Sequence, residues 1–152
     1  MQTVPKPTVY ITGSLRNPSI TELGASVRAV GYDVFDDWHA AGPIADDEWR
    51  RYEKERGHTY SEALVGLAAQ HVLHFDLQHL NRASVAILAL PAGRSGHLEL
   101  GYIVGQGKRG YVLLDQDYDR WDVMYGLASG VFDNKDELLD VLRKNLAPRW
   151  TN

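Results

Sequence analysis

The chain contains no cysteine in its 152 residues. This absence excludes disulfide bonds, a thiolate nucleophile and cysteine-ligated metal sites, and it agrees with a reducing cytosol. No run of about eighteen apolar residues is present, so we expect no membrane-spanning helix and no membrane partner. Residues 1–7 lack the apolar core of a secretory signal peptide. These absences together predict a cytoplasmic protein.

A block of basic residues is also missing. The 16 Lys and Arg residues are outnumbered by 20 Asp and Glu residues, which gives a formal net charge of −4. Binding to a nucleic acid polymer or to an anionic membrane surface needs a basic face, so this charge argues against both partners. The six histidines lack a clustered ligand spacing, apart from His71 and His74 three residues apart. We therefore expect no metal site and no cofactor.

The composition that is present, 44% hydrophobic and 24% charged residues, is that of an ordinary globular protein. The length suits one domain over residues 1–152. Short apolar runs alternate with segments of helical periodicity along the chain. The expected strands cover residues 8–12, 32–35, 84–90, 110–114 and 130–132. The expected helices cover residues 19–30, 59–81 (one helix or two abutting ones), 96–106, 121–128 and 134–146.

This alternation predicts an α/β fold, a single three-layer domain around a doubly wound, parallel, five-stranded sheet. Ser19 and Glu22 have the spacing of a capping box at the start of the first helix. Residues 39–57 are polar and highly charged, and we interpret them as a long loop with room for one helical turn. Such a loop beside a cleft often serves as a lid, and a solvated surface helix is the alternative.

Two loops of this fold are expected to face each other. Ligands of doubly wound sheets bind beyond the carboxyl ends of the strands, where the strand order reverses. In a 2-1-3-4-5 order that point lies between the first and third strands, whose loops are residues 13–17 and 91–95. Both loops contain glycine, serine and arginine and lead into a helix N-terminus, which favours an anion. The pair indicates a phosphate or carboxylate ligand, although these residue types are also ordinary in turns and on surfaces.

Glu99 is the first candidate for a catalytic role. It lies in the stretch Ser95-Gly96-His97-Leu98-Glu99-Leu100-Gly101, which is typical of a tight turn followed by the start of a helix. We expect Glu99 in or near the first helical turn, where unpaired N–H groups and the helix dipole favour an ionised carboxylate. Such a carboxylate at the mouth of a sheet suits a nucleophile. The alternative is a glutamate that serves the helix dipole alone.

Three stretches in this order resemble the nucleoside 2-deoxyribosyltransferase superfamily, which includes 2'-deoxynucleoside 5'-phosphate N-hydrolases. They are residues 10–16, 76–80 and 97–101, and the resemblance extends from the first strand to about residue 130. It implies a flavodoxin-like fold and a glutamate nucleophile, Glu99 by match, that attacks the anomeric carbon of the sugar. It also implies that Asp76 helps to protonate the departing base.

The resemblance further implies a sugar or phosphate pocket at the loop after the first strand, formed by Gly13, Ser14, Leu15 and Arg16. The form of this loop is closer to the nucleotide hydrolases than to the transferases. Upstream of the nucleophile the match is incomplete. The transferases have an acidic residue, and the hydrolases tend to have a phosphate-binding serine, where this chain has Gly93. The nearest serine here is Ser95, with Arg94 beside it.

Asp122 and Met124 correspond to residues that the transferases supply to a neighbouring subunit's sugar pocket, which implies a homodimer or a higher homo-oligomer. Three other candidates come from their places beside the cleft. Tyr10 would contact the sugar or polarise the nucleophile, or else be a core residue of its strand. Asp36 and Trp38 follow the second strand, where the indole would stack on a base or simply pack in a capped loop.

These residues predict an enzyme that releases the base from a nucleoside or deoxynucleoside 5'-monophosphate by cleaving its N-glycosidic bond. A covalent deoxyribosyl–Glu99 intermediate would pass to water in a hydrolase. It would pass to another base in a nucleoside 2-deoxyribosyltransferase, which is the main alternative. A non-catalytic nucleotide-binding module and an NAD-glycohydrolase-like enzyme are further alternatives, and a chain this short leaves the latter little room for a dinucleotide.

Overall fold

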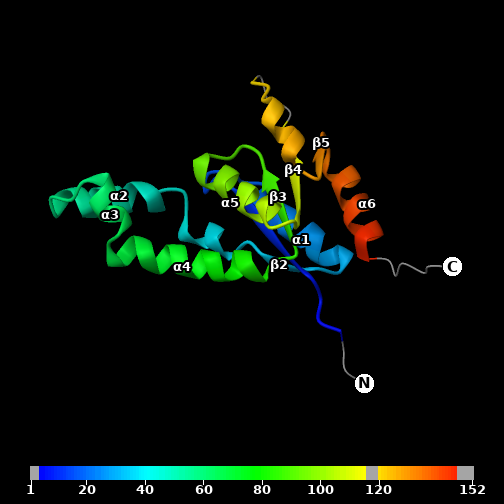
Figure 1. Cartoon of the computed structure of the whole chain (residues 1–152), viewed down its shortest axis with the longest axis horizontal. Coiled ribbons are helices and arrows are strands. Elements are labelled where there is room, and N and C mark those ends of the chain that lie inside the picture. The colour runs from blue at the N-terminus through cyan, green and yellow to red at the C-terminus, as the bar shows by residue number, and fades with distance from the viewer. Residues whose placement is uncertain (1–3, 116–119, 147–152) are drawn as a thin grey trace.

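The computed structural model describes residues 4–115 and 120–146 and is built around a five-stranded sheet. The strands are β1 (Thr8–Gly13), β2 (Asp33–Phe35), β3 (Val85–Ala89), β4 (Arg109–Leu113) and β5 (Gly130–Phe132). Their order is β2-β1-β3-β4-β5, and all neighbours are parallel (Figure 1). The expected doubly wound α/β architecture, a flavodoxin-like fold, is therefore confirmed.

Helices cover both faces of the sheet, so its central strand is apolar throughout. All five residues of β3 are buried, as expected of a parallel strand with a helical layer on each side. Helices α1 (Ile20–Val30) and α6 (Lys135–Leu146) pack on one face, over Val9 and Ile11 of β1. Helices α4 (Leu67–Arg82) and α5 (Arg94–Gly105) pack on the other, over Tyr10. No helix in the described part of the chain is long and apolar enough to cross a membrane.

An arm of helices extends beyond the edge of the sheet (Figure 1). After the short 3₁₀ helix η1 (Asp37–Ala41), it comprises α2 (Ala45–Glu55), α3 (Tyr60–Leu64) and the first part of α4. The interpretation of residues 39–57 as a loop was wrong, and the surface-helix alternative is what the structure has. Three acidic residues in the first turn of α2 stabilise it by interacting with the positive end of its helix dipole. Contacts that no local pattern reveals then hold the arm together, including Trp49 against Tyr60 with ring centroids 6.3 Å apart.

The helix boundaries differ from expectation at two further points. The capping box expected at Ser19 is absent: its side chain makes no capping hydrogen bond, and Glu22 instead pairs with Lys135 of α6 at 2.7 Å. The capping box lies at Thr59 and Glu62, at the start of α3. The segment 59–81 divides into two helices, as one of the two expectations had it. The short helix expected at 121–128 is the 3₁₀ helix η2 (Val123–Leu127).

Candidate active site

Glu99 occupies the second turn of α5, because that helix begins at Arg94. Glu99 therefore lies near the first turn and not in it, and its hydrogen bonds in the described part of the chain are not to the free N–H groups of the helix start. It turns instead toward the sheet, where the Thr12 hydroxyl group donates to Glu99 Oε1 at 3.2 Å. Gly96 allows this approach, because a Cβ there would lie 2.9 Å from Leu88 Cδ1 and 3.2 Å from Thr12 Oγ1.

Two residues of β1 hold the Glu99 carboxyl group. Tyr10 and Thr12 are two residues apart on one strand, so both side chains point to the face that α5 covers. The Tyr10 hydroxyl group donates a second hydrogen bond to Glu99. Tyr10 and Thr12 are almost completely buried. The two alternatives for Tyr10 are thus compatible. It is a core residue of its strand, and it also contacts the candidate nucleophile.

Burial opposes the ionisation of Glu99. It raises the pKa of the Glu99 carboxyl group above its usual range, whereas the hydrogen bonds from Tyr10 and Thr12 lower this pKa and the nearby Asp76 raises it again. Burial and the negative charge of Glu99 also strongly raise the pKa of the Tyr10 hydroxyl group, so Tyr10 remains a donor. The carboxylate therefore depends on two side-chain donors in a partly buried site.

Asp76 lies close enough to Tyr10 and Glu99 to influence their pKa values. It is half-buried on α4, and burial raises the pKa of its carboxyl group, while the positive charge of His79 lowers it. Its own negative charge raises the pKa values of Tyr10 and Glu99. The structure thus brings the three expected catalytic residues together on the face of the sheet that α4 and α5 cover. Two neighbouring carboxyl groups with raised pKa values can divide the roles of nucleophile and acid between them.

An aromatic cluster that the sequence analysis missed adjoins these carboxyl groups. Phe35, the last residue of β2, contacts the ring of Tyr10 at 5.0 Å and stacks on His79 at 4.1 Å with an interplanar angle of 5°. Phe75 contacts Phe35 and His79 edge-on, at 5.9 and 4.7 Å. The only signal in the sequence was the placement of Phe75 and His79 on either side of Asp76, within one helical turn.

The two loops at the switch point lie side by side, as expected. The backbone N–H of Ser14 donates to Pro91 O at 3.3 Å. Asn17, which the sequence analysis also missed, is buried between the loops, and its amide donates to Ala89 O and Leu90 O at 3.4 Å. Its Oδ1 accepts from Ser19 N at 2.9 Å, an Asx turn that the Asn17-Pro18 dipeptide could have indicated.

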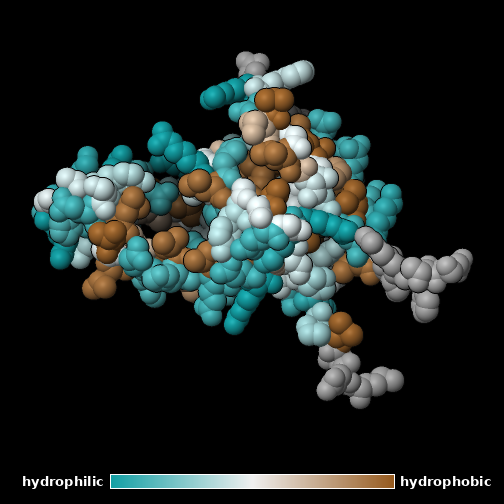
Figure 2. All heavy atoms as spheres, in the orientation of Figure 1, coloured by the Kyte–Doolittle hydropathy of each residue, from teal (hydrophilic) through white to brown (hydrophobic). Residues whose placement is uncertain are grey.

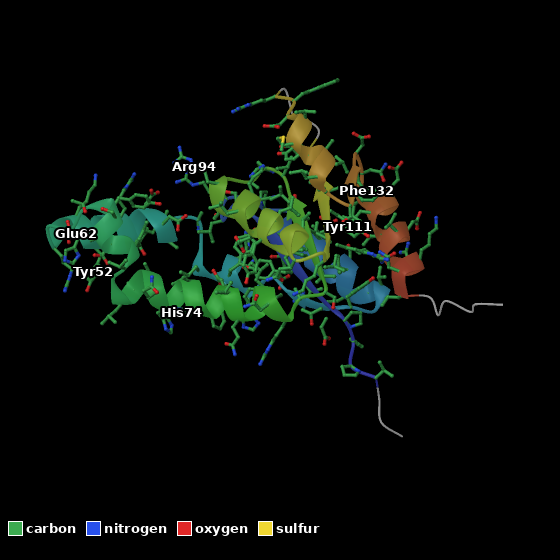
Figure 3. The ribbon with its side chains drawn as sticks, viewed as in Figure 1. Tyr52, Glu62, His74, Arg94, Tyr111 and Phe132 are labelled. Atoms are coloured by element: carbon green, nitrogen blue, oxygen red, sulfur yellow. The ribbon has the colours of Figure 1, made fainter. Side chains whose placement is uncertain are left out.

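The two arginines of these loops have different surroundings. Arg16 donates to Asp47 of α2 at 3.0 Å, so it joins its loop to the arm in an exposed ion pair. Arg94 extends into solvent from the first residue of α5 (Figure 3). A shallow pocket at this helix start is lined by Ala92, Gly93, Arg94, His97 and Leu98. Among the described residues, Arg94 has no ion-pair partner. Ser95 is exposed in the same turn.

Asp36 and Trp38 both make contacts within the fold. Asp36 forms an ion pair with Arg28 of α1 at 2.7 Å, and only 11% of its side chain is exposed. The Trp38 indole donates to Ile11 O at 2.7 Å, just beyond the last residue of β1 that pairs with β2. Through these contacts both residues stabilise the strand ends, which agrees with the alternative that Trp38 packs in a capped loop.

Asp122 and Met124 lie on the β4 side of the molecule. The Asp122 carboxylate accepts from Met124 N at 2.9 Å and so caps η2. Met124 is 59% exposed. Asp122 also lines a second pocket, at the carboxyl ends of β3 and β4, together with Leu90, Pro91, Ala92, His97, Asp115, Arg120 and Tyr125. Within the described part of one chain, no hydrogen bond connects Asp122 or Met124 with Glu99.

Comparison with protein-family models finds no match, and comparison with curated protein sequences finds none either. Solved structures do match over most of their length. A 2-deoxyribosyltransferase from Bacillus psychrosaccharolyticus aligns with a TM-score of 0.60 at 13% identity, covering 88% of this chain and 90% of its own. The CMP N-glycosidase BcmB of Clostridium botulinum aligns with a TM-score of 0.54 at 14% identity, over 89% and 97%.

A conserved protein from Enterococcus faecalis aligns with a TM-score of 0.62 at 10% identity, covering 93% of this chain and 99% of its own. At such identities the likeness establishes a shared fold, and fold alone does not establish function. The three neighbours are consistent with the resemblance of the sequence to the nucleoside 2-deoxyribosyltransferase superfamily.

Proposed function

We propose that this protein cleaves the N-glycosidic bond of a nucleoside or deoxynucleoside 5'-monophosphate and releases the free base. One observation carries the proposal: Glu99, held by the Tyr10 and Thr12 hydroxyl groups, lies close to a second carboxyl group, Asp76, on the face of the sheet that α4 and α5 cover. Retaining glycosidases use two neighbouring carboxyl groups in the same way. The names of two structural neighbours, a CMP N-glycosidase and a 2-deoxyribosyltransferase, support this class of reaction.

In the proposed reaction the ionised Glu99 attacks the anomeric carbon of the sugar. The bond between this carbon and the base nitrogen breaks, its electron pair leaves with the base, and the Asp76 proton neutralises the leaving nitrogen. Water then attacks the anomeric carbon of the glycosyl ester, gives up a proton to Asp76 and frees Glu99. Tyr10 and Thr12 keep the carboxylate ionised and aimed throughout.

The proposed phosphate site is the start of α5. There Arg94 is exposed beside unpaired backbone N–H groups, and the adjoining loop carries Ser14 and Arg16. Arg16 would have to exchange Asp47 for the phosphate, so Arg94 is the stronger candidate. The match to a nucleotide hydrolase is incomplete at Gly93, which keeps a nucleoside deoxyribosyltransferase as the second candidate. The named transferase among the structural neighbours favours it.

We also propose a homo-oligomer. Large apolar side chains are exposed on the arm and along α4, at Leu64, Val65, Leu67, Val72, Leu73 and Phe75. A second group surrounds η2, at Trp121, Val123, Met124 and Leu127. Figure 2 shows apolar side chains bordering a hollow between the arm and α5. Light scattering after gel filtration tests the proposal, and a monomer at assay concentration would contradict it.

Chromatographic detection of free base tests the function directly. Matched nucleosides and nucleoside monophosphates are incubated with the enzyme, with and without a second base. Release from monophosphates in water supports the hydrolase. Turnover of free nucleosides that depends on the second base supports the transferase. Binding without any release, equal for wild type and Glu99→Gln, identifies a non-catalytic module instead.

A further inference from the structure

His79 lies beside the candidate site and has no part in the reaction described above. Its ring is stacked on Phe35, with centroids 4.1 Å apart and planes within 5°. Phe75 contacts the same ring edge-on at 4.7 Å. Asp76 precedes His79 by three residues on α4, so the two side chains are neighbours on that helix. The imidazole is thus held in place one helical turn from the proposed acid.

Phe35 also connects His79 with the nucleophile. The Phe35 and Tyr10 rings lie 5.0 Å apart, and the Tyr10 hydroxyl group donates to Glu99. The row of rings therefore runs from α4 through the end of β2 to β1. It fixes the imidazole relative to both carboxyl groups, so a charge on the ring would act from a constant position.

We propose that His79 is a positioning residue for Asp76: its imidazolium, clamped on Phe35, sets the pH range over which the Asp76 carboxyl group holds a proton. The inference rests on the proposed function in one respect, that Asp76 passes this proton to the leaving base. The titratable groups that face Asp76 are Tyr10 from β1, Glu99 from α5 and His79 on its own helix. The two carboxyl groups oppose each other's ionisation, and His79 supplies the positive charge that favours ionised Asp76.

The direction of the effect follows from these charges. Burial raises the pKa of Asp76, and the positive charge of His79 counteracts part of this rise. This effect belongs to the charged form of the ring, so a neutral side chain at position 79 removes it. His79→Phe keeps an aromatic ring on Phe35 and removes the charge. Asp76 should then hold its proton to a pH about half a unit higher.

The test is a carboxyl-carbon NMR titration of protein labelled at aspartate, with the Asp76 signal assigned by its loss in Asp76→Asn. The wild type is compared with His79→Phe and with His79→Gln, which is neutral and smaller. His74→Phe is the matched control, because His74 is exposed on the same helix and points away from the sheet (Figure 3). Both neutral His79 variants should move the Asp76 midpoint upward, and the control should not.

An unchanged Asp76 midpoint in the folded His79 variants would overturn the inference. If one variant fails to fold, the other decides. The titration needs no turnover, so its outcome is separate from that of the proposed function. A shifted midpoint in a protein that releases no base would refute only the proposed function. If base is released, the falling limb of kcat/KM should move upward together with the midpoint in the His79 variants and remain in place in His74→Phe.

Discussion

The Thr12 hydroxyl group donates to Glu99 Oε1 at 3.2 Å and so joins strand β1 to the second turn of α5. Its partner Tyr10, on the same face of the strand, donates a second hydrogen bond. Without these donors, burial would keep the Glu99 carboxyl group protonated to higher pH. The strand thus controls the charge state of a residue on the helix.

Replacing Thr12 with valine should therefore change the pH dependence of base release. Loss of the hydrogen bond raises the pKa of Glu99 further, and the nucleophile must be ionised to react. The rising limb of kcat/KM should move to higher pH by roughly one unit, equivalent to about 1.4 kcal/mol. Thr12→Ser is the matched control, since it keeps the hydroxyl group. Equal profiles for the valine and serine variants would show that the hydrogen bond does not govern Glu99.

Glu99→Gln should reduce base release by at least about a thousandfold, as expected for loss of a nucleophile. A loss of about tenfold or less, roughly 1.4 kcal/mol in the barrier, would contradict the assignment.

The same variant, Glu99→Gln, should melt at a higher temperature than the wild type at pH 7. The pKa of Glu99 is raised in the folded state, so stability is lost as pH rises through that pKa. The difference in melting temperature should disappear below the unfolded pKa, near about pH 4.

Asp76→Asn should slow base release by about a hundredfold or more if Asp76 is the general acid. The loss should be smaller for substrates whose leaving group needs no proton. The measurement compares kcat/KM for a natural substrate and for an analogue with an activated leaving group. If both fall by the same factor, Asp76 contributes by positioning or charge and not by protonating the base.

The sheet was predictable from the sequence because β3 is apolar on both faces and glycine marks the strand ends, as at Gly13. Glu99 and Tyr10 could be placed in one site because Glu99 follows the third strand and Tyr10 lies on the first, and these two strands are neighbours in the expected order. Helix α2 could not be foreseen from its pattern, since its residues are mostly charged and few are buried. The contacts that support it come from residues beyond its end, with His58 paired to the buried Glu53 and Tyr60 of α3 packed against Trp49.

The helix that carries Glu99 was expected to begin at Gly96 and begins at Arg94, for a local reason. Gly93 serves as the N-cap residue of α5, so the helix begins before the glycine that seemed to mark its turn. Gly96 is instead an internal residue that lets the helix approach Leu88 and Thr12. A glycine inside a helix and one that precedes it cannot be distinguished by spacing alone.

A pair of alanine substitutions on α5 tests this close approach. Gly101→Ala should stabilise the protein by up to about 1 kcal/mol, since a Cβ there meets nothing within 4 Å and alanine favours helix. Gly96→Ala gains the same propensity but places its Cβ 2.9 Å from Leu88 Cδ1. It should be less stable than Gly101→Ala by roughly 1–3 kcal/mol and should lose activity, because α5 must shift away from Thr12. Denaturant unfolding measures the two stabilities. Equal values for Gly96→Ala and Gly101→Ala would show that α5 does not pack tightly against Leu88 and Thr12.

The phosphate site distinguishes the two proposed enzymes, and Arg94 is the residue to change. It is exposed at the start of α5 without an ion-pair partner in the described part of the chain, whereas Arg16 is paired with Asp47 at 3.0 Å. Arg94→Ala should raise KM for a nucleoside monophosphate by about tenfold or more, the value of a charge-assisted hydrogen bond, and leave KM for the matching nucleoside unchanged. Arg16→Ala should have the smaller effect. Asp47→Asn, which frees Arg16, should lower KM for the monophosphate if that arginine reaches the phosphate.

The wild type itself distinguishes the two enzymes. Equal or better turnover of free nucleosides, accelerated by a second base, would reject the hydrolase in favour of the deoxyribosyltransferase.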